Sequence, residues 1–198
     1  MLNYDVMLAK TQVTDIDYFL ELINDSPANK MLLNEKIDII EKCMATAQKL
    51  LEGLQLSDIS SPLSLIERNG YQLVEDSDFT SFPIFAVCNP NEKSIVMNAK
   101  AISKTSAILE EWSEIDEKWA VNFKNLVLWH EIFHMLEEED ATIYTRRPIL
   151  EKYFLGRRKR LPLDCASEIG AIYFSKLVTN ISFNPRVFEG MESKIFGT

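Results

Sequence analysis

The chain has 198 residues, of which 46% are hydrophobic, so it can bury a sizeable core and is expected to form one compact domain over residues 1–198. Its 21 basic residues are outnumbered by 30 acidic ones, and the formal net charge of −9 repels the phosphate backbone of a nucleic acid. Nucleic-acid binding is therefore not expected.

The N-terminus has no basic region followed by an apolar stretch and a cleavage site, so no secretory signal is expected. Charged residues interrupt each apolar run well before the roughly 18 residues that a membrane span requires. Three cysteines without a C-x-x-C pair favour reduced, buried thiols over disulfides: Cys43, Cys88 and Cys165. We therefore expect a cytoplasmic protein that does not enter a membrane.

The first 60 residues are expected to form a helical scaffold. Apolar residues recur at three-to-four spacing over 16–24 and 31–52, without internal glycine or proline, which predicts two helices. A third, short helix is predicted over 61–68, because Asn69-Gly70 supplies a left-handed stop after it.

The character of the sequence changes after residue 70. Three short runs rich in β-branched or aromatic residues, 71–74, 83–88 and 94–98, are bounded by turn formers, which predicts a small three-stranded sheet. The segment 89–93 suits a hairpin loop. Pro83 should lie at a strand start or on an edge, because it cannot donate to a ladder.

A long central helix is predicted over 114–138. Ser113 followed three residues later by Asp116 resembles a capping box at its start. Apolar residues surround nearly the whole helix, which indicates burial on most sides.

Beyond this helix, a short helix is predicted over 148–155 and a basic loop over 156–160. A last substantial helix is predicted over 165–178, with Asp164 as its cap, and residues 181–198 are expected to form a C-terminal tail.

The only two histidines lie in the predicted central helix, in His130-Glu131-Ile132-Phe133-His134. This H-E-x-x-H pattern places two imidazoles one turn apart on one helix face, where both can reach one Zn²⁺ ion. Two imidazoles among apolar residues would be costly without such a partner. Glu131 lies beside them and could act as the general base that activates water.

A catalytic zinc needs three protein ligands and one open position, and with no third histidine the remaining ligand must be a carboxylate or a cysteine. Glu168 is the strongest candidate, because Gly170 and Ala171 would let its helix approach the central one closely. The alternative interpretation of Glu168 is a surface carboxylate near a helix start. Three other carboxylates remain candidates for the ligand: Asp164, Glu137 and Glu138.

These residues resemble the ImmA/IrrE-type metallopeptidases, small intracellular relatives of the gluzincins. The family pattern is a strand pair, an H-E-x-x-H helix and a later helix with E-x-x-A, and the matching pieces are 84–98, 130–134 and Glu168-Ile169-Gly170-Ala171. The resemblance covers residues 61–180 and implies an edge strand, 94–98, that could pair with an extended peptide. The sequence departs from the family at Phe133, where glycine is common, and shows no helix-turn-helix module.

A zinc peptidase also needs a donor for the developing oxyanion. The candidates are Tyr144, Tyr153 and Tyr173, although tyrosines at such spacings are more often packing residues. The basic run at 157–160 could receive an acidic partner near the cleft, and a solvated loop is its commoner explanation.

The sequence therefore predicts an α+β, zincin-like fold, mostly helical, with the zincin-like core over 61–180. Zn²⁺ is expected to be held by His130, His134 and Glu168, and the predicted function is hydrolysis of a peptide or protein substrate. The alternative is a regulatory or binding protein that keeps zinc without peptidase turnover.

Overall fold

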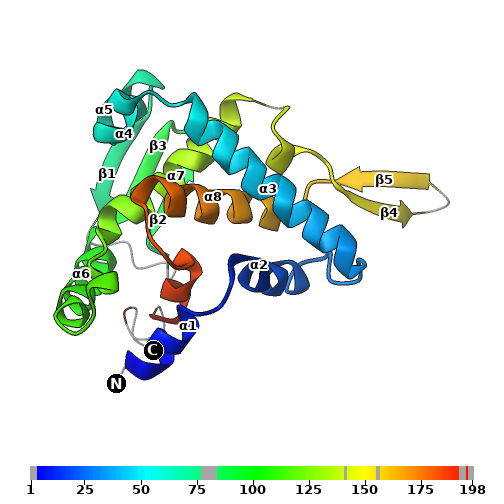
Figure 1. Cartoon of the computed structure of the whole chain (residues 1–198). Coiled ribbons are helices and arrows are strands. Elements are labelled where there is room, and N and C mark those ends of the chain that lie inside the picture. The colour runs from blue at the N-terminus through cyan, green and yellow to red at the C-terminus, as the bar shows by residue number, and fades with distance from the viewer. Residues whose placement is uncertain (1–3, 77–83, 141, 155–156, 192–194, 196–198) are drawn as a thin grey trace.

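The structure is a computed structural model that describes the following residues: 4–76, 84–140, 142–154, 157–191 and 195. The chain is mostly helical, with one three-stranded sheet and one two-stranded hairpin (Figure 1). The α-helices are α1 (Tyr4–Lys10), α2 (Asp15–Asn24), α3 (Leu33–Gly53), α4 (Leu56–Ser60), α5 (Pro62–Arg68), α6 (Ala99–Ser113), α7 (Phe123–Glu139) and α8 (Asp164–Thr179). The strands are β1 (Gln72–Asp76), β2 (Ala86–Asn89), β3 (Ser94–Asn98), β4 (Leu150–Phe154) and β5 (Arg157–Leu161), and three 3₁₀ turns are η1 (Glu117–Trp119), η2 (Tyr144–Arg146) and η3 (Pro185–Met191).

The predicted N-terminal helices are confirmed as α2, α3 and α5. Thr14 begins α2, where its hydroxyl accepts a hydrogen bond from the backbone N–H of Asp17 at 3.2 Å. Gly70 follows α5 with a φ of +74°, the left-handed conformation that glycine adopts without strain. Helices α2 and α3 pack against α8 through a buried apolar cluster that includes Phe19, Ile40 and Ile169.

The three-stranded sheet has the order β1-β3-β2, with β1 parallel and β2 antiparallel to β3. The predicted hairpin loop between β2 and β3 is confirmed. The expectation that 94–98 is an edge strand is wrong, because β3 lies in the centre and β2 is an edge strand. The continuous burial of β3 is typical of a central strand, whereas β1 is mostly exposed. Pro83 lies outside the described residues.

The helix predicted over 114–138 starts too early, because α6 ends at Ser113, the 3₁₀ turn η1 follows, and only the segment from Phe123 onwards belongs to α7. Ser113 is the last residue of α6, and its hydroxyl donates to the carbonyl of Glu110 at 2.7 Å instead of capping a new helix. Helix α7 begins only at Phe123. Its cap is Asn122, whose side chain accepts a hydrogen bond from the N–H of Asn125 at 3.0 Å.

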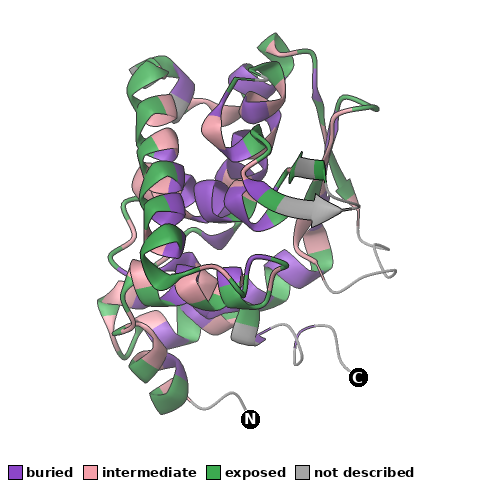
Figure 2. Cartoon of the chain, turned by 90° about the vertical axis from the view of Figure 1, so that its right-hand side faces the viewer, coloured by how far each residue is buried: buried purple, intermediate pink, exposed green. Residues whose placement is uncertain are grey.

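Helix α7 is buried along most of its length, as expected, and packs against α8. Trp129, Ile132 and Phe133 are fully buried, and Figure 2 shows exposed residues mainly on the outer faces of the surrounding helices. A Cβ added to Gly170 of α8 would lie 2.8 Å from Cε1 of Phe133 and closer still to its Cζ. The glycine therefore allows the close approach of the two helices that the sequence predicts.

The helix predicted over 148–155 and the basic loop over 156–160 are instead strands β4 and β5, which form a hairpin that projects from the body (Figure 1). Register places Glu151 opposite Arg160, and their side chains form an ion pair with an Nε–Oε1 distance of 3.0 Å. An opposite charge across the ladder lets a basic run form a strand.

The segment predicted as a C-terminal tail contributes several buried residues to the core, as far as the structure describes it. Phe183, Val187 and Phe188 are at most 3% exposed, and the Phe183 ring lies 5.3 Å from that of Trp119. The spacing of Phe183, Val187 and Phe188 is that of a helix face. Pro185 and the glycines in this segment indicated an irregular tail instead, so the sequence did not predict this packing.

None of the helices in the described ranges combines the length and the apolarity of a membrane span.

Candidate metal centre

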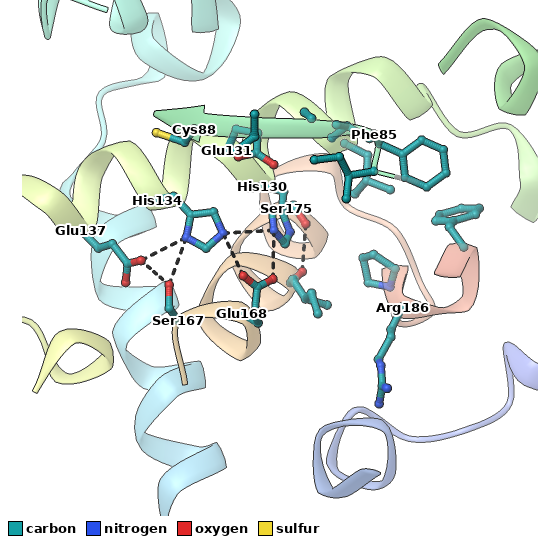
Figure 3. Close-up of a pocket in the computed structure, with 18 of the residues that line it drawn as sticks. Phe85, Cys88, His130, Glu131, His134, Glu137, Ser167, Glu168, Ser175 and Arg186 are labelled. Atoms are coloured by element: carbon teal, nitrogen blue, oxygen red, sulfur yellow. Dashed lines mark hydrogen bonds and ion pairs between the residues drawn. The ribbon is translucent and has the colours of Figure 1, made fainter. Parts of the chain in front are cut away.

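One face of α7 brings the two histidines together. The Nε2 atoms of His130 and His134 lie 3.2 Å apart (Figure 3). Their side chains are 24% and 19% exposed, so both rings are sheltered by the protein but open to a cavity on one side.

Glu168 reaches the same point from α8. Its Oε2 lies 3.4 Å from Nε2 of His130, and its Oε1 lies 3.5 Å from Nε2 of His134. Among the residues that the structure describes, these three form the group whose ligand atoms all lie within 4.8 Å of one another. The close packing of α8 on α7 over Gly170 produces this convergence.

The spacing fits a zinc ion. Zinc binds nitrogen and oxygen ligands at about 2.0–2.2 Å in a tetrahedron, which separates ligand atoms by about 3.3–3.5 Å. The three distances here are 3.2, 3.4 and 3.5 Å. Two imidazoles and one carboxylate also form the donor set of catalytic zinc sites, which keep a fourth position open.

The electrostatics of the metal-free site favour a positive charge at this point. Burial lowers the pKa of His134, but the hydrogen bond to Glu137 and the charges of Glu168 and Glu131 outweigh it and raise the pKa to about 9. Desolvation raises the pKa of Glu168, but the hydrogen bond from His130 and the charges of both histidines lower it to about 2. A metal cation can replace the proton that these carboxylates stabilise.

Two of the other carboxylates that the sequence left open have different partners. Glu137 lies behind His134, with Oε1 3.0 Å from Nδ1, on the opposite side of the ring from Nε2. It therefore does not share the ligand position of Glu168. Glu138 forms an ion pair with Arg146 at 2.5 Å.

Asp164 does not have the capping role that the sequence suggested. Helix α8 begins with Asp164 itself, and Leu163 occupies the N-cap position. The exposed Asp164 side chain is in the first turn and lines the cavity.

Glu131 is separate from the three convergent residues. It is 6% exposed, lines the cavity and lies beside His130, on the side of the site that faces β2 (Figure 3). A carboxylate in this position is available to exchange a proton with water or substrate.

The cavity has a volume of about 590 Å³ and is bounded by β2, α7, α8 and η3. Its wall near the start of α7 is apolar, with Phe85, Phe123 and Phe188 in edge-to-face contact at centroid distances of 4.9 and 5.1 Å. The opposite end carries the polar residues around Glu138 and Asp164. The two histidines lie between these ends.

The candidate oxyanion donors are not brought to the cavity, as far as the structure describes them. Tyr144 begins η2, lies under the ammonium of Lys42 and lines no part of the cavity, and burial raises its pKa to about 12. Tyr173 packs among the apolar residues around α8. Tyr153 lies on β4, and its side chain is outside the described part.

Several residues that the sequence did not assign to the site line the cavity. Ser167 and Ser175 line the cavity from α8, and Arg186 from η3, with Cys88 on β2. Burial, and to a smaller extent the negative charge of Glu131, raise the pKa of the Cys88 thiol to about 12. Arg186 points away from the histidines (Figure 3) and donates to the carbonyl of Tyr18 at 2.7 Å, so it holds η3 against α2.

Comparison with protein-family models, with curated proteins and with solved structures gives no match to this chain. The interpretation of the site therefore depends on the geometry of the chain's own residues.

Proposed function

We propose that the protein is a zinc-dependent peptidase with a zincin-like core, related to the ImmA/IrrE-type family that its motifs resemble. His130, His134 and Glu168 would hold Zn²⁺, and Glu131 would be the general base. The observation that carries this proposal is the convergence of three ligand atoms at 3.2–3.5 Å beside a buried carboxylate that is not one of them.

Zinc bound by such a set supplies Lewis acidity and lowers the pKa of water. Glu131 would accept a proton from the attacking water and deliver it to the leaving amine of the substrate. Its low exposure supports this role, because few water molecules then compete for the carboxylate. One carboxylate would therefore carry out both proton transfers, from the water and to the leaving amine.

The edge strand β2 is the feature that supports a peptide as substrate. Within the described part of the sheet, β2 is paired with β3 on one side only, and its residues Ala86, Val87 and Cys88 line the cavity. An extended peptide could add to this edge by backbone hydrogen bonds. Strand β2 would then be the peptide-binding edge strand that the family resemblance implied at 94–98.

The apolar end of the cavity supports a preference within that class of substrate. A peptide lying along β2 would place one side chain against the rings of Phe85 and Phe123. Burial of a large apolar side chain there contributes about 1.5–3 kcal/mol. We therefore expect cleavage next to a bulky apolar residue.

Glu131→Gln tests the mechanism directly. The variant should bind zinc with wild-type affinity, whereas peptide hydrolysis should fall by a factor of about 10²–10⁴, because the general base is lost. Zinc affinity is measured by chelator competition, and cleavage by mapping new peptide termini after incubation with a proteome.

The control is Glu139→Gln, which changes the same group at the exposed end of α7 and should leave both properties unchanged. A wild-type cleavage rate in Glu131→Gln would contradict the mechanism. Zinc binding by the wild-type protein without any new termini would instead support the regulatory alternative.

A further inference from the structure

Glu137 is a buried carboxylate that the proposed chemistry does not use. Its residue is 1% exposed, although it begins the acidic run Glu137-Glu138-Glu139-Asp140 at the end of α7, where Glu139 and Asp140 are exposed. An ionised carboxylate in such a place is costly unless several donors surround it. The structure supplies three donors, from three different elements.

Each oxygen of Glu137 is occupied. Oε2 accepts a hydrogen bond from the Thr145 hydroxyl of η2 at 2.7 Å. Oε1 accepts a short hydrogen bond from the Ser167 hydroxyl of α8 and lies 3.0 Å from Nδ1 of His134. Burial raises the pKa of Glu137, but these three hydrogen bonds lower it below its usual value.

The arrangement fixes the histidine ring as well as the carboxylate. Nδ1 of His134 faces Glu137 and, at 3.0 Å, the Ser167 oxygen, so a proton on Nδ1 has two acceptors. The lone pair of the neutral ring then resides on Nε2, which is the atom that faces His130 and Glu168. A carboxylate acceptor also raises the basicity of the nitrogen across the ring.

We propose that Glu137 is a positioning residue of the metal centre, which holds His134 in the tautomer and orientation that present Nε2 to the ion. This inference rests on the proposed binding of zinc by His130, His134 and Glu168, but it does not require peptidase activity. Ser167 and Thr145 support the carboxylate in turn. Because Ser167 directly precedes Glu168, the first turns of α8 provide both a ligand and this support.

The test is the zinc affinity of Glu137→Gln, measured by chelator competition, together with the visible absorption spectrum of the Co²⁺-substituted protein. Glutamine has the same size and still accepts a hydrogen bond, so a role limited to packing predicts unchanged values. A positioning role predicts zinc binding weakened by roughly 10–100-fold and an altered Co²⁺ spectrum. Ser167→Ala should weaken binding in the same direction and to a smaller extent.

The matched control is Glu139→Gln, which removes the same charge two residues further along α7 at an exposed position. Unfolding of each metal-free variant shows that the comparison is made between folded proteins. Wild-type zinc affinity and spectrum in Glu137→Gln, or an equal loss in Glu139→Gln, would overturn the proposal. Failure of the wild-type protein to bind zinc would overturn both the metal centre and this role, whereas zinc binding without hydrolysis would overturn only the peptidase.

Discussion

His134 lies between two carboxylates that act on different ring atoms. Glu168 approaches Nε2 at 3.5 Å, and Glu137 lies 3.0 Å from Nδ1. If the proposed zinc binds, a shared ion would replace the first contact, whereas the second would be compatible with the metal-bound ring. The two carboxylates should therefore respond differently to substitution.

The raised pKa of His134 predicts how zinc binding depends on pH. With a pKa of about 9 in the metal-free protein, His134 is protonated at neutral pH and must lose a proton to bind the ion. Apparent zinc affinity should rise about tenfold per pH unit between pH 7 and 9 and then level off. Chelator-competition titrations across this range measure the slope, and an affinity independent of pH would contradict the assignment of His134 as a ligand.

Helices α7 and α8 pack closely because one of the two carries a small residue at their contact. In this chain the small residue is Gly170 of α8, and the large residue opposite it is Phe133 of α7. Phe133 stands where the family that the motifs resemble often has glycine, and its ring fills the space above Gly170. The centroid of the ring also lies 5.6 Å from that of Phe174. The space that the large side chain of Phe133 needs is thus provided by the absence of a side chain at Gly170.

Gly170→Ala tests this contact. The added methyl group would overlap the Phe133 ring, which is fully buried against Phe174, so the substitution should lower the free energy of unfolding by about 1–3 kcal/mol. Urea denaturation of the metal-free protein measures the loss. Gly53→Ala is the control, because nothing lies within 4 Å of a Cβ at Gly53 and its φ is not left-handed; an equal loss in the control would contradict the explanation.

Sequence patterns predicted the helices and strands that depend on residues close together in the chain. Periodicity located α2, α3 and α8, and turn formers located the sheet and the stop at Gly70. The start of α7 was misplaced, because Ser113 and Asp116 satisfy a local capping pattern while Asn122 forms the cap in the structure. The H-E-x-x-H motif also predicted that His130 and His134 converge, because helix geometry fixes their spacing, whereas Glu168 was selected among four carboxylates by the small residues that follow it.

What the sequence did not show depends on contacts between distant segments. The hairpin β4–β5 joins a basic run to an acidic residue across a ladder, and the choice of β2 as an edge strand depends on where β1 pairs. The buried role of Glu137 depends on hydroxyl groups of η2 and α8. Only the i, i+3 spacing of His134 and Glu137 was visible beforehand as a signal.

For the whole molecule, the proposed metal centre lies where two apolar clusters meet. One cluster surrounds α7, the sheet and η3, and the other joins α2 and α3 to α8. Ligands from α7 and α8 would be held together by one ion, so metal binding should stabilise the native state as a whole.

Thermal and urea unfolding with zinc and with a chelator measure this linkage. At a free zinc concentration of about 1,000 times its Kd, the free energy of unfolding should increase by about 4 kcal/mol. Glu168→Gln should lose most of this increase, because it removes the ligand from α8. An undiminished increase in that variant would mean that zinc binds elsewhere on the protein.

The projecting hairpin lies between α7 and α8 in the sequence. Leu150 and Leu163, at its base, are buried against the cluster around α3 and α8, while the strands extend outwards (Figure 1). His134 and Glu168 thus lie on either side of a hairpin whose described residues line no part of the cavity. Substitutions in the described strands of this hairpin should therefore leave the positions of His134 and Glu168 unchanged.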